Sequence, residues 1–380
     1  MPAVKAIVAE LPTTPLVRNW SLQDVDVGSP GDDEVLVELY ASGICQSDIL
    51  LGSLPSGAVG VEYPKIVGHE GAGVVQEVGK NVQSVAVGDP VVLSFSSCES
   101  CAQCEESHPA YCEDFKPRNY RGKLESTKMS SSGEKVWTEF FGQSSFSQLS
   151  VVNKTSIVNV KGLIHDLSEL KLFAPLGCGF QTGMGAVQNV AQVTPKDVVL
   201  ISGLGAVGMG AVMTAAIEQC KTIIAVDRVK SRLDSARKAG ATHVINTSDP
   251  SFTNLDEAVR ALVPGGVSIA IDATGAAEII EQSMKATRKR GKMILVGVPP
   301  LDYFVHIRGT DILNSGRSVA GCLVGDCDSQ VAIPQIIKWY REGKFPIDQC
   351  VQSFDAVEYE KALESFKNGE TIKPVLVWKE

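Results

Sequence analysis

The chain has 380 residues, of which 44% are hydrophobic and 21% charged, and its formal net charge is −9. This composition supplies a sizeable core and excludes disorder as an overall description, while the length predicts two domains. The acidic balance, without blocks of Lys or Arg, argues against nucleic acid and anionic membranes as partners. Because the N-terminus has no sustained apolar stretch, we expect a cytoplasmic protein, in which ten cysteines indicate metal or catalysis before disulfides.

The first third of the sequence favours β structure, because alternating stretches such as 34–39 and 73–78 are separated by Gly, Pro and Asp turns. The Ser-rich stretch 126–135 predicts an exposed loop. From about residue 195, apolar β-branched strands alternate with helical stretches. We expect these strands at 197–202, 222–227, 243–246, 267–273, 292–298 and 318–322. This alternation predicts the α/β class, with a doubly wound parallel sheet and helices on both faces.

One charge-free run, residues 198–217, is as long as a bilayer span. Its four glycines divide it into a strand, a turn and a helix, which is typical of a soluble nucleotide-binding domain. We therefore predict no membrane segment there.

The glycine-rich turn after the first of these strands carries the clearest cofactor signal. Residues 203–208 read Gly-Leu-Gly-Ala-Val-Gly, and Asp227 ends the next strand 19 residues after Gly208. In this context the pattern predicts a dinucleotide site whose pyrophosphate lies at the helix N-terminus. Asp227 favours NAD over NADP by accepting from ribose hydroxyls, whereas Arg228 leaves NADP open. The candidate residues of the turn are Gly203, Gly205, Val207 and Gly208.

Four cysteines lie within fifteen residues, at Cys98, Cys101, Cys104 and Cys112. A closed set of four thiolates satisfies tetrahedral zinc and leaves no open position for chemistry. The surrounding stretch has little apolar content, so a metal would supply the stability that packing cannot. An iron–sulfur cluster also uses four cysteines, but the usual terminal Cys-Pro is absent. The stretch therefore predicts a structural zinc site.

A second set, Cys45, His69 and Cys178, is dispersed along the chain. Taken singly, such residues are more typical of a buried thiol or a core imidazole. Together they form a Cys₂His set, which in catalytic zinc sites leaves a fourth position for water or substrate. Asp48 and Glu70 lie beside the proposed ligands and are candidates for the hydrogen bonds that orient them.

These three features together resemble the zinc-dependent medium-chain alcohol dehydrogenases over essentially the whole chain. Residues 140–146 (Phe-Phe-Gly-Gln-Ser-Ser-Phe) and 177–183 (Gly-Cys-Gly-Phe-Gln-Thr-Gly) look most like the aryl (benzyl) alcohol dehydrogenases. The resemblance implies a mostly β, GroES-like and partly barrel catalytic domain at 1–182 and 330–380. It also implies a Rossmann domain at 183–329.

The resemblance assigns roles to individual residues. It implies a catalytic zinc on Cys45, His69 and Cys178, a structural zinc on the four-cysteine set, and Ser47 as the hydroxyl that accepts the alcohol proton. The implied coenzyme contacts are Thr182 beside the nicotinamide, Arg232 at the adenosine ribose, Lys373 near the pyrophosphate, and Val296, Cys322 and Val324 facing the nicotinamide amide.

Two positions depart from the family pattern. Leu50 stands where many relatives carry a His that ends a proton relay, so the relay is expected to end at the ribose, water or another base. Gln46 stands where several relatives have a basic pyrophosphate contact, which is expected to loosen coenzyme binding.

The implied activity is reversible hydride transfer between NAD and a hydrophobic, aromatic or allylic, primary alcohol or its aldehyde, in a homodimer or homotetramer. One alternative is a non-catalytic sensor or structural protein that binds NAD and zinc, and the intact Cys₂His set with Ser47 argues against it. A zinc-free reductase of the same superfamily would lack both metal sets. The apolar candidates for the pocket wall, which name no particular molecule, are Leu50, Phe95, Phe141 and Val298.

Overall fold

The computed structural model describes residues 3–379, which divide into two compact units. The first unit contains the described residues up to Cys178, Asp328–Lys338, and those from Cys350 on. The second contains Gly179–Cys327 and Trp339–Gln349. The sequence places the boundaries at 182/183 and 329/330, and its pattern carries no sign that 339–349 return to the second unit.

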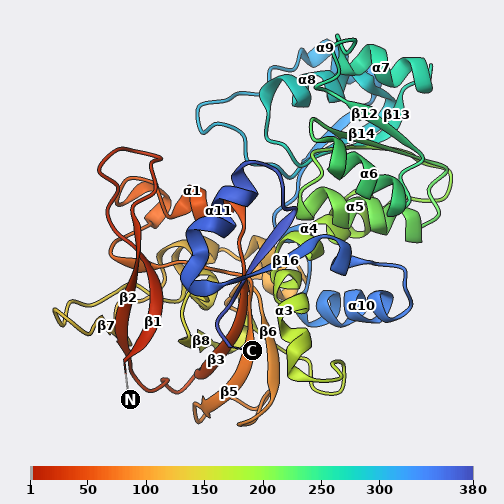
Figure 1. Ribbon diagram of the computed structural model, residues 1–380. Coiled ribbons are helices and arrows are strands. Elements are labelled where there is room, and N and C mark those ends of the chain that lie inside the picture. Colours follow the sequence, from red (N-terminus) through yellow and green to blue (C-terminus); the bar gives the residue numbers. More distant parts are fainter. Residues whose placement is uncertain (1–2, 380) are drawn as a thin grey trace. The chain divides into compact units, whose positions relative to one another are not determined.

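The first unit is mostly β (Figure 1). Its larger sheet runs in the order β16-β17-β3-β5-β6-β9, with β8 also paired to β3, and its smaller sheet runs β4-β1-β2-β7. The strands of the larger sheet are β3 (Glu34–Gly43), β5 (Gly71–Val78), β6 (Pro90–Leu93), β8 (Leu149–Asn153), β9 (Ile157–Asn159), β16 (Val351–Asp355) and β17 (Lys373–Val377). Those of the smaller sheet are β1 (Val4–Ala9), β2 (Trp20–Val27), β4 (Lys65–Ile66) and β7 (Thr127–Met129). The helices are α1 (Gln46–Leu51), α2 (Ala102–Glu105), α3 (Leu170–Phe173) and α11 (Tyr359–Lys367), while α10 (Ser329–Arg341) crosses into the second unit.

Strand β3 pairs with the strands next to which the candidate site lies. Its alternating Val35, Val37 and Leu39 face a buried core, because side chains on one strand point to opposite faces in turn. At its end, Ser42 lies opposite Gly71 of β5, and Gly43 lies opposite Val375 of β17. This register brings three chain segments that are distant in sequence to one end of the sheet.

The second unit is a doubly wound α/β domain (Figure 1). Its parallel sheet runs in the order β12-β11-β10-β13-β14-β15. The strands are β10 (Val198–Ser202), β11 (Thr222–Asp227), β12 (His243–Asn246), β13 (Val267–Asp272), β14 (Thr287–Leu295) and β15 (Ser318–Gly321). The helices are α4 (Gly179–Gly185), α5 (Ala206–Ile217), α6 (Lys230–Lys238), α7 (Leu255–Leu262), α8 (Ala277–Ala286) and α9 (Gly309–Ser315). Helices α5 and α6 lie on the opposite side of the strands from α7 and α8, so the predicted fold class is confirmed.

The prediction of a loop at 126–135 is wrong at its start. Residues Thr127–Met129 form strand β7, paired antiparallel with β2, and Thr127 and Met129 are buried. The Ser-rich remainder is an exposed turn. Among residues 3–379, no helix is both long enough and apolar enough to cross a bilayer.

Candidate active site

Asp48 of helix α1 connects two of the predicted ligands, Cys45 and His69, through hydrogen bonds. Cys45 is its N-cap residue and donates its backbone N–H to Asp48 Oδ2 at 2.9 Å, as in a capping box. The other carboxylate oxygen, Oδ1, accepts from the Gly68 N–H at 3.0 Å and lies 2.6 Å from His69 Nδ1. One wholly buried carboxylate therefore fixes Cys45 and the imidazole of His69 relative to each other.

One of the two ring nitrogens of His69 makes no hydrogen bond. With Nδ1 bonded to Asp48, Nε2 is buried and has no hydrogen-bond partner in the structure. A buried polar atom without a partner costs free energy, which a bound metal would recover. The ring of Phe141 stacks on the imidazole, with centroids 4.4 Å apart and planes 24° apart.

Cys45, His69 and Cys178 lie together, and Glu70 joins them. One ligand atom from each of these four residues lies within 4.8 Å of the other three. The hydrogen bond between the two thiols lowers the pKa of Cys45 and raises that of Cys178. Two thiols, an imidazole and a carboxylate are a donor set that suits zinc, and the orphaned Nε2 makes the residues fit such an ion.

Lys373 lies beside this set. Its Nζ donates to both carboxylate oxygens of Glu70, at 2.8 and 2.9 Å, and to the Ile44 carbonyl at 2.9 Å. Burial raises the pKa of Glu70, and the Lys373 ammonium opposes that rise. The carboxylate of Glu70 thus faces Lys373 and the ligand cluster, whereas Nδ1 of the His69 ring is hydrogen-bonded to Asp48. A role of Lys373 near a pyrophosphate stays a prediction.

An aromatic wall surrounds the ring of Phe141. Its centroid lies 5.7 Å from that of Tyr120 and 6.1 Å from that of Phe115, and Phe95 lies 5.9 Å from Phe115. Phe95, Phe115 and Phe141 are buried. The sequence interpretation missed Phe115 and Tyr120, although their position just after the four-cysteine stretch was a usable signal. Ser47, in the first turn of α1, is half-buried.

The four-cysteine set also converges. Its sulfur atoms lie within 4.8 Å of one another, with 3.5 Å between Cys101 and Cys104 and 3.8 Å between Cys98 and Cys104. Sulfurs on the corners of a zinc tetrahedron with bonds of about 2.3 Å would be about 3.8 Å apart. The N–H of Ser100 lowers the pKa of Cys98 to about 6, while burial raises that of Cys112 to about 12. All ten cysteines of the described chain are free thiols.

The glycine turn of the second unit forms an open cradle at the N-terminus of α5. Gly203 has a φ of +88°, and a Cβ on Gly208 would lie 1.8 Å from the Gly203 carbonyl oxygen, so both positions require glycine. A Cβ on Gly205 would meet nothing within 4 Å. Asp227 accepts from the Leu204 N–H at 2.7 Å and from the Val229 N–H at 2.9 Å, which orders the turn. Free N–H groups at this helix end suit a phosphate.

The remaining predicted coenzyme residues lie in the second unit. Thr182 is in α4 and Val324 is in a short helix that packs against it, where a Cβ on Gly325 would lie 3.0 Å from the Thr182 Cα. Val296 and Cys322 follow β14 and β15, and Arg232 is in α6.

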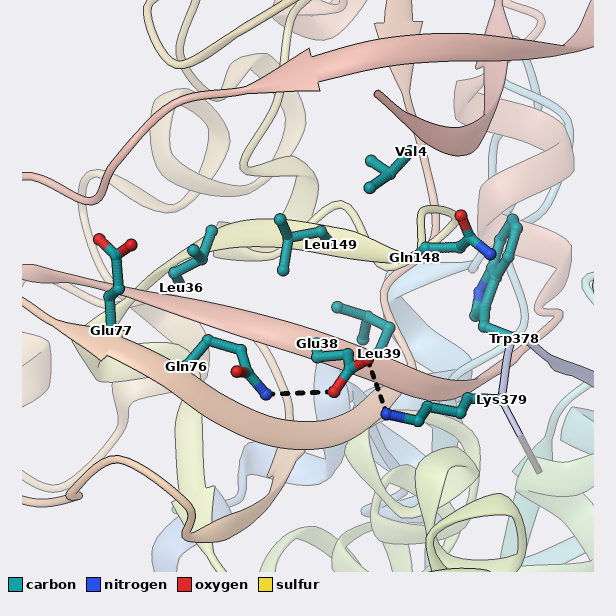
Figure 2. A pocket seen from close by; sticks show the side chains of 10 residues that line it. All are labelled: Val4, Leu36, Glu38, Leu39, Gln76, Glu77, Gln148, Leu149, Trp378 and Lys379. Atoms are coloured by element: carbon teal, nitrogen blue, oxygen red, sulfur yellow. Dashed lines mark hydrogen bonds and ion pairs between the residues drawn. The ribbon is translucent and has the colours of Figure 1, made fainter. Parts of the chain in front are cut away.

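Figure 2 shows a cavity of about 530 Å³ on the first unit that contains no predicted site residue. Two of its charged residues are paired with each other, since Glu38 accepts from Lys379 at 2.8 Å and also from Gln76 at 3.1 Å. Leu36 and Leu149 contribute apolar surface. We assign no chemistry to it.

Comparison with known proteins agrees with this geometry. Two family models match, "Zinc-binding dehydrogenase" at residues 206–342 and "Alcohol dehydrogenase GroES-like domain" at residues 31–162. Geraniol dehydrogenase from Castellaniella defragrans is 33% identical over 362 residues, which is 94% of each chain. A solved alcohol dehydrogenase zinc-binding domain protein from Burkholderia ambifaria has a TM-score of 0.91 at 36% identity, covering 100% of this chain and 99% of its own. Benzyl alcohol dehydrogenase from Acinetobacter calcoaceticus has a TM-score of 0.89 at 34% identity, covering 99% of each.

The fold and the site thus define a zinc-binding oxidoreductase with a GroES-like domain and a Rossmann domain. The chain belongs to the zinc-dependent medium-chain alcohol dehydrogenase family, as the sequence predicted.

Proposed function

We propose that the protein reversibly oxidises a hydrophobic, aromatic or allylic, primary alcohol to its aldehyde, with NAD as the hydride acceptor. The catalytic zinc would be held by Cys45, His69 and Cys178, and a second, structural zinc by the four-cysteine set. The observation that carries the proposal is the buried, unpartnered Nε2 of His69, which faces two thiols beneath an aromatic wall.

When bound, zinc supplies a Lewis acid that lowers the pKa of an alcohol, and the nicotinamide supplies a hydride acceptor. The chain supplies position and environment. Asp48 holds the His69 ring with Nε2 directed at the ligand set, and Phe141 excludes water from one face of the imidazole. The hydroxyl oxygen of Ser47 takes the alcohol proton. With Leu50 in place of a His, that proton leaves through a ribose hydroxyl, water or another base.

The aromatic wall supports the substrate class. Buried phenyl rings favour planar, polarizable groups over short alkyl chains, because ring pairs gain energy beyond the area they bury. Geraniol is an allylic alcohol and benzyl alcohol an aromatic one, and the dehydrogenases named for them resemble this chain over nearly its whole length.

The second unit supports NAD. The carboxylate of Asp227 stands at the end of β11, where it would repel a 2′-phosphate, while Arg228 beside it is exposed. We also include a homodimer or homotetramer in the proposal. The segment before edge strand β15 exposes Leu301, Phe304 and Leu313, an apolar surface that an oligomer would cover.

Steady-state kinetics on aromatic, allylic and short alkyl primary alcohols, each with NAD and with NADP, test the proposal. We expect the highest kcat/KM for aromatic or allylic alcohols with NAD. Cys45→Ser should abolish turnover while the circular dichroism spectrum stays unchanged, and metal analysis should fall from about two zinc ions per chain to about one. Full activity in a preparation verified as metal-free would refute the mechanism.

A further inference from the structure

The side chain of Gln143 has no role in the mechanism above, yet it makes three buried hydrogen bonds to backbone groups close to the proposed zinc ligands. The side chain is wholly buried. Its Nε2 donates to the His69 carbonyl at 2.9 Å and to the Ser94 carbonyl at 2.8 Å, and its Oε1 accepts from the Gly71 N–H at 3.0 Å. A carboxamide with three good partners in a core is an ordering element, because each partner would otherwise be an unpaired buried group.

Two of these bonds lie on either side of Glu70. The His69 carbonyl belongs to the peptide before Glu70, and the Gly71 N–H belongs to the peptide after it. One carboxamide therefore fixes the backbone that presents both the His69 imidazole and the Glu70 carboxylate to the ligand cluster.

The third bond leads to Cys178. The Ser94 hydroxyl donates to the Gly177 carbonyl, in the peptide just before Cys178, at 2.7 Å. The carbonyl of the same Ser94 accepts from Gln143, so Gln143 is connected to the Cys178 segment through Ser94. A Cβ on Gly177 would lie 1.9 Å from the Leu93 carbonyl oxygen, so the backbone at Gly177 packs against the segment of Leu93 and Ser94 too closely for any larger residue. Gln143 and Ser94 thus join the segments of two ligands that are 109 residues apart in the sequence.

The backbone around Gln143 is strained. Glu139, Phe141 and Ser144 have φ values of 57°, 53° and 53°, in the left-handed region that residues with a Cβ rarely adopt. Such conformations cost about 1–3 kcal/mol each and tend to cluster where function demands them. Here they let residues 140–143 place Phe141 on the face of the His69 ring and Gln143 on its backbone.

We propose that Gln143 is a positioning residue of the catalytic metal centre, which acts through Ser94 to hold the His69–Gly71 and Gly177–Cys178 segments at a fixed separation. The inference rests on the proposed function, since it assumes that Cys45, His69 and Cys178 bind the zinc. It predicts that losing the carboxamide loosens this zinc and alters its coordination geometry without affecting the four-cysteine site.

The test is Gln143→Met, which keeps the length of the side chain and removes every hydrogen bond. Release of zinc to a chromophoric chelator should resolve two sites, and the catalytic one should release faster by about 10–100-fold, as for other residues that orient metal ligands. After Co²⁺ replaces the catalytic zinc, the visible absorption bands of the ion should shift. The four-cysteine site serves as the internal control and should release zinc at the wild-type rate.

Gln282→Met is the matched control, because Gln282 is also a buried carboxamide, whose bonds go to Leu255 and Glu278 in the second unit. It should lower stability without changing either metal readout. If Gln143→Met does not fold, Ser94→Ala removes only one hydroxyl and should accelerate release in the same direction. Wild-type release rates and Co²⁺ bands in Gln143→Met, or in Ser94→Ala if that variant stands in, would overturn the inference. A wild-type protein with no metal on Cys45, His69 and Cys178 would instead overturn the proposed function.

Discussion

Lys373 and Glu70 form an ion pair whose disruption should be costly. Their side chains are 3% and 0% exposed, and the ammonium donates to both carboxylate oxygens and to the Ile44 carbonyl. Lys373→Met has nearly the same length but removes the charge. It would leave the buried Glu70 carboxylate without its ammonium partner and the Ile44 carbonyl with one donor fewer.

Removing one partner of a buried ion pair costs about 3–5 kcal/mol, mostly because the remaining charge is left uncompensated. For a folding unit of about 200 residues this corresponds to a fall in Tm of about 6–20 °C. The double variant Lys373→Met/Glu70→Gln removes both charges, so it should regain most of that loss. Lys379→Met is the exposed control, since its Glu38 partner lies at the surface, and it should cost at most about 1 kcal/mol.

Urea unfolding followed by tryptophan fluorescence is the appropriate assay. Trp20, Trp137 and Trp378 lie in the first unit and only Trp339 lies in the second, so the signal mainly reports the unit that contains the pair. The reasoning would be refuted if Lys373→Met cost no more than Lys379→Met, or if the double variant were as unstable as the single one.

Three further outcomes are expected. Burial raises the pKa of Glu139 from 4.5 to about 7, so between these pH values the folded state binds more protons than the unfolded state. The free energy of unfolding should therefore fall by about 3 kcal/mol as the pH rises through this window. In urea titrations at successive pH values, Glu139→Gln should remove that part of the pH dependence. If the protein forms the proposed homodimer or homotetramer through this surface, replacing exposed Phe304 and Leu313 by Glu should lower its mass in analytical ultracentrifugation, and an unchanged mass would exclude this surface as the interface. Cys112→Ser should lower the zinc content by about one ion per chain and raise protease sensitivity around the four-cysteine stretch, whereas a retained second zinc would argue against the closed set.

Local patterns predicted the parts of the site that are local in the chain. The four cysteines lie within fifteen residues, so their spacing alone predicted a metal site. Asp48 was a candidate because it lies three residues after Cys45, but Cys45 itself was predicted only together with His69 and Cys178. The strands of the second unit could also be predicted from the sequence, because each strand of a parallel sheet is a short apolar run between helices. The start of 126–135 was misread because three residues of strand carry too little alternation to outweigh the Ser-rich turn that follows.

Long-range pairings were beyond reach of the sequence. Lys373 meets Glu70 because β17 pairs with β3 and β3 pairs with β5, a register set by turns and strand packing across the unit. Gln143 lies in the stretch 140–146 that carries the family resemblance, but nothing in the sequence indicated what its side chain bonds to. Its partners are backbone groups, which leave no mark on side-chain patterns.

The two metal sets differ in what must hold them together. The four-cysteine set lies within one short stretch, so the proposed structural zinc would satisfy all four thiols and order its own surroundings. In the proposed function the Cys45, His69 and Cys178 set would leave a position for substrate, so the ion alone could not fix the geometry of ligands drawn from three distant segments. In the structure Asp48 bonds to the Cys45 backbone and the His69 ring, and Gln143 bonds to the His69 backbone and, through Ser94, reaches the peptide before Cys178; all of these are hydrogen bonds among protein groups. We therefore expect metal removal to loosen the four-cysteine loop while the catalytic ligands keep their arrangement, which is the preorganisation that an open site requires.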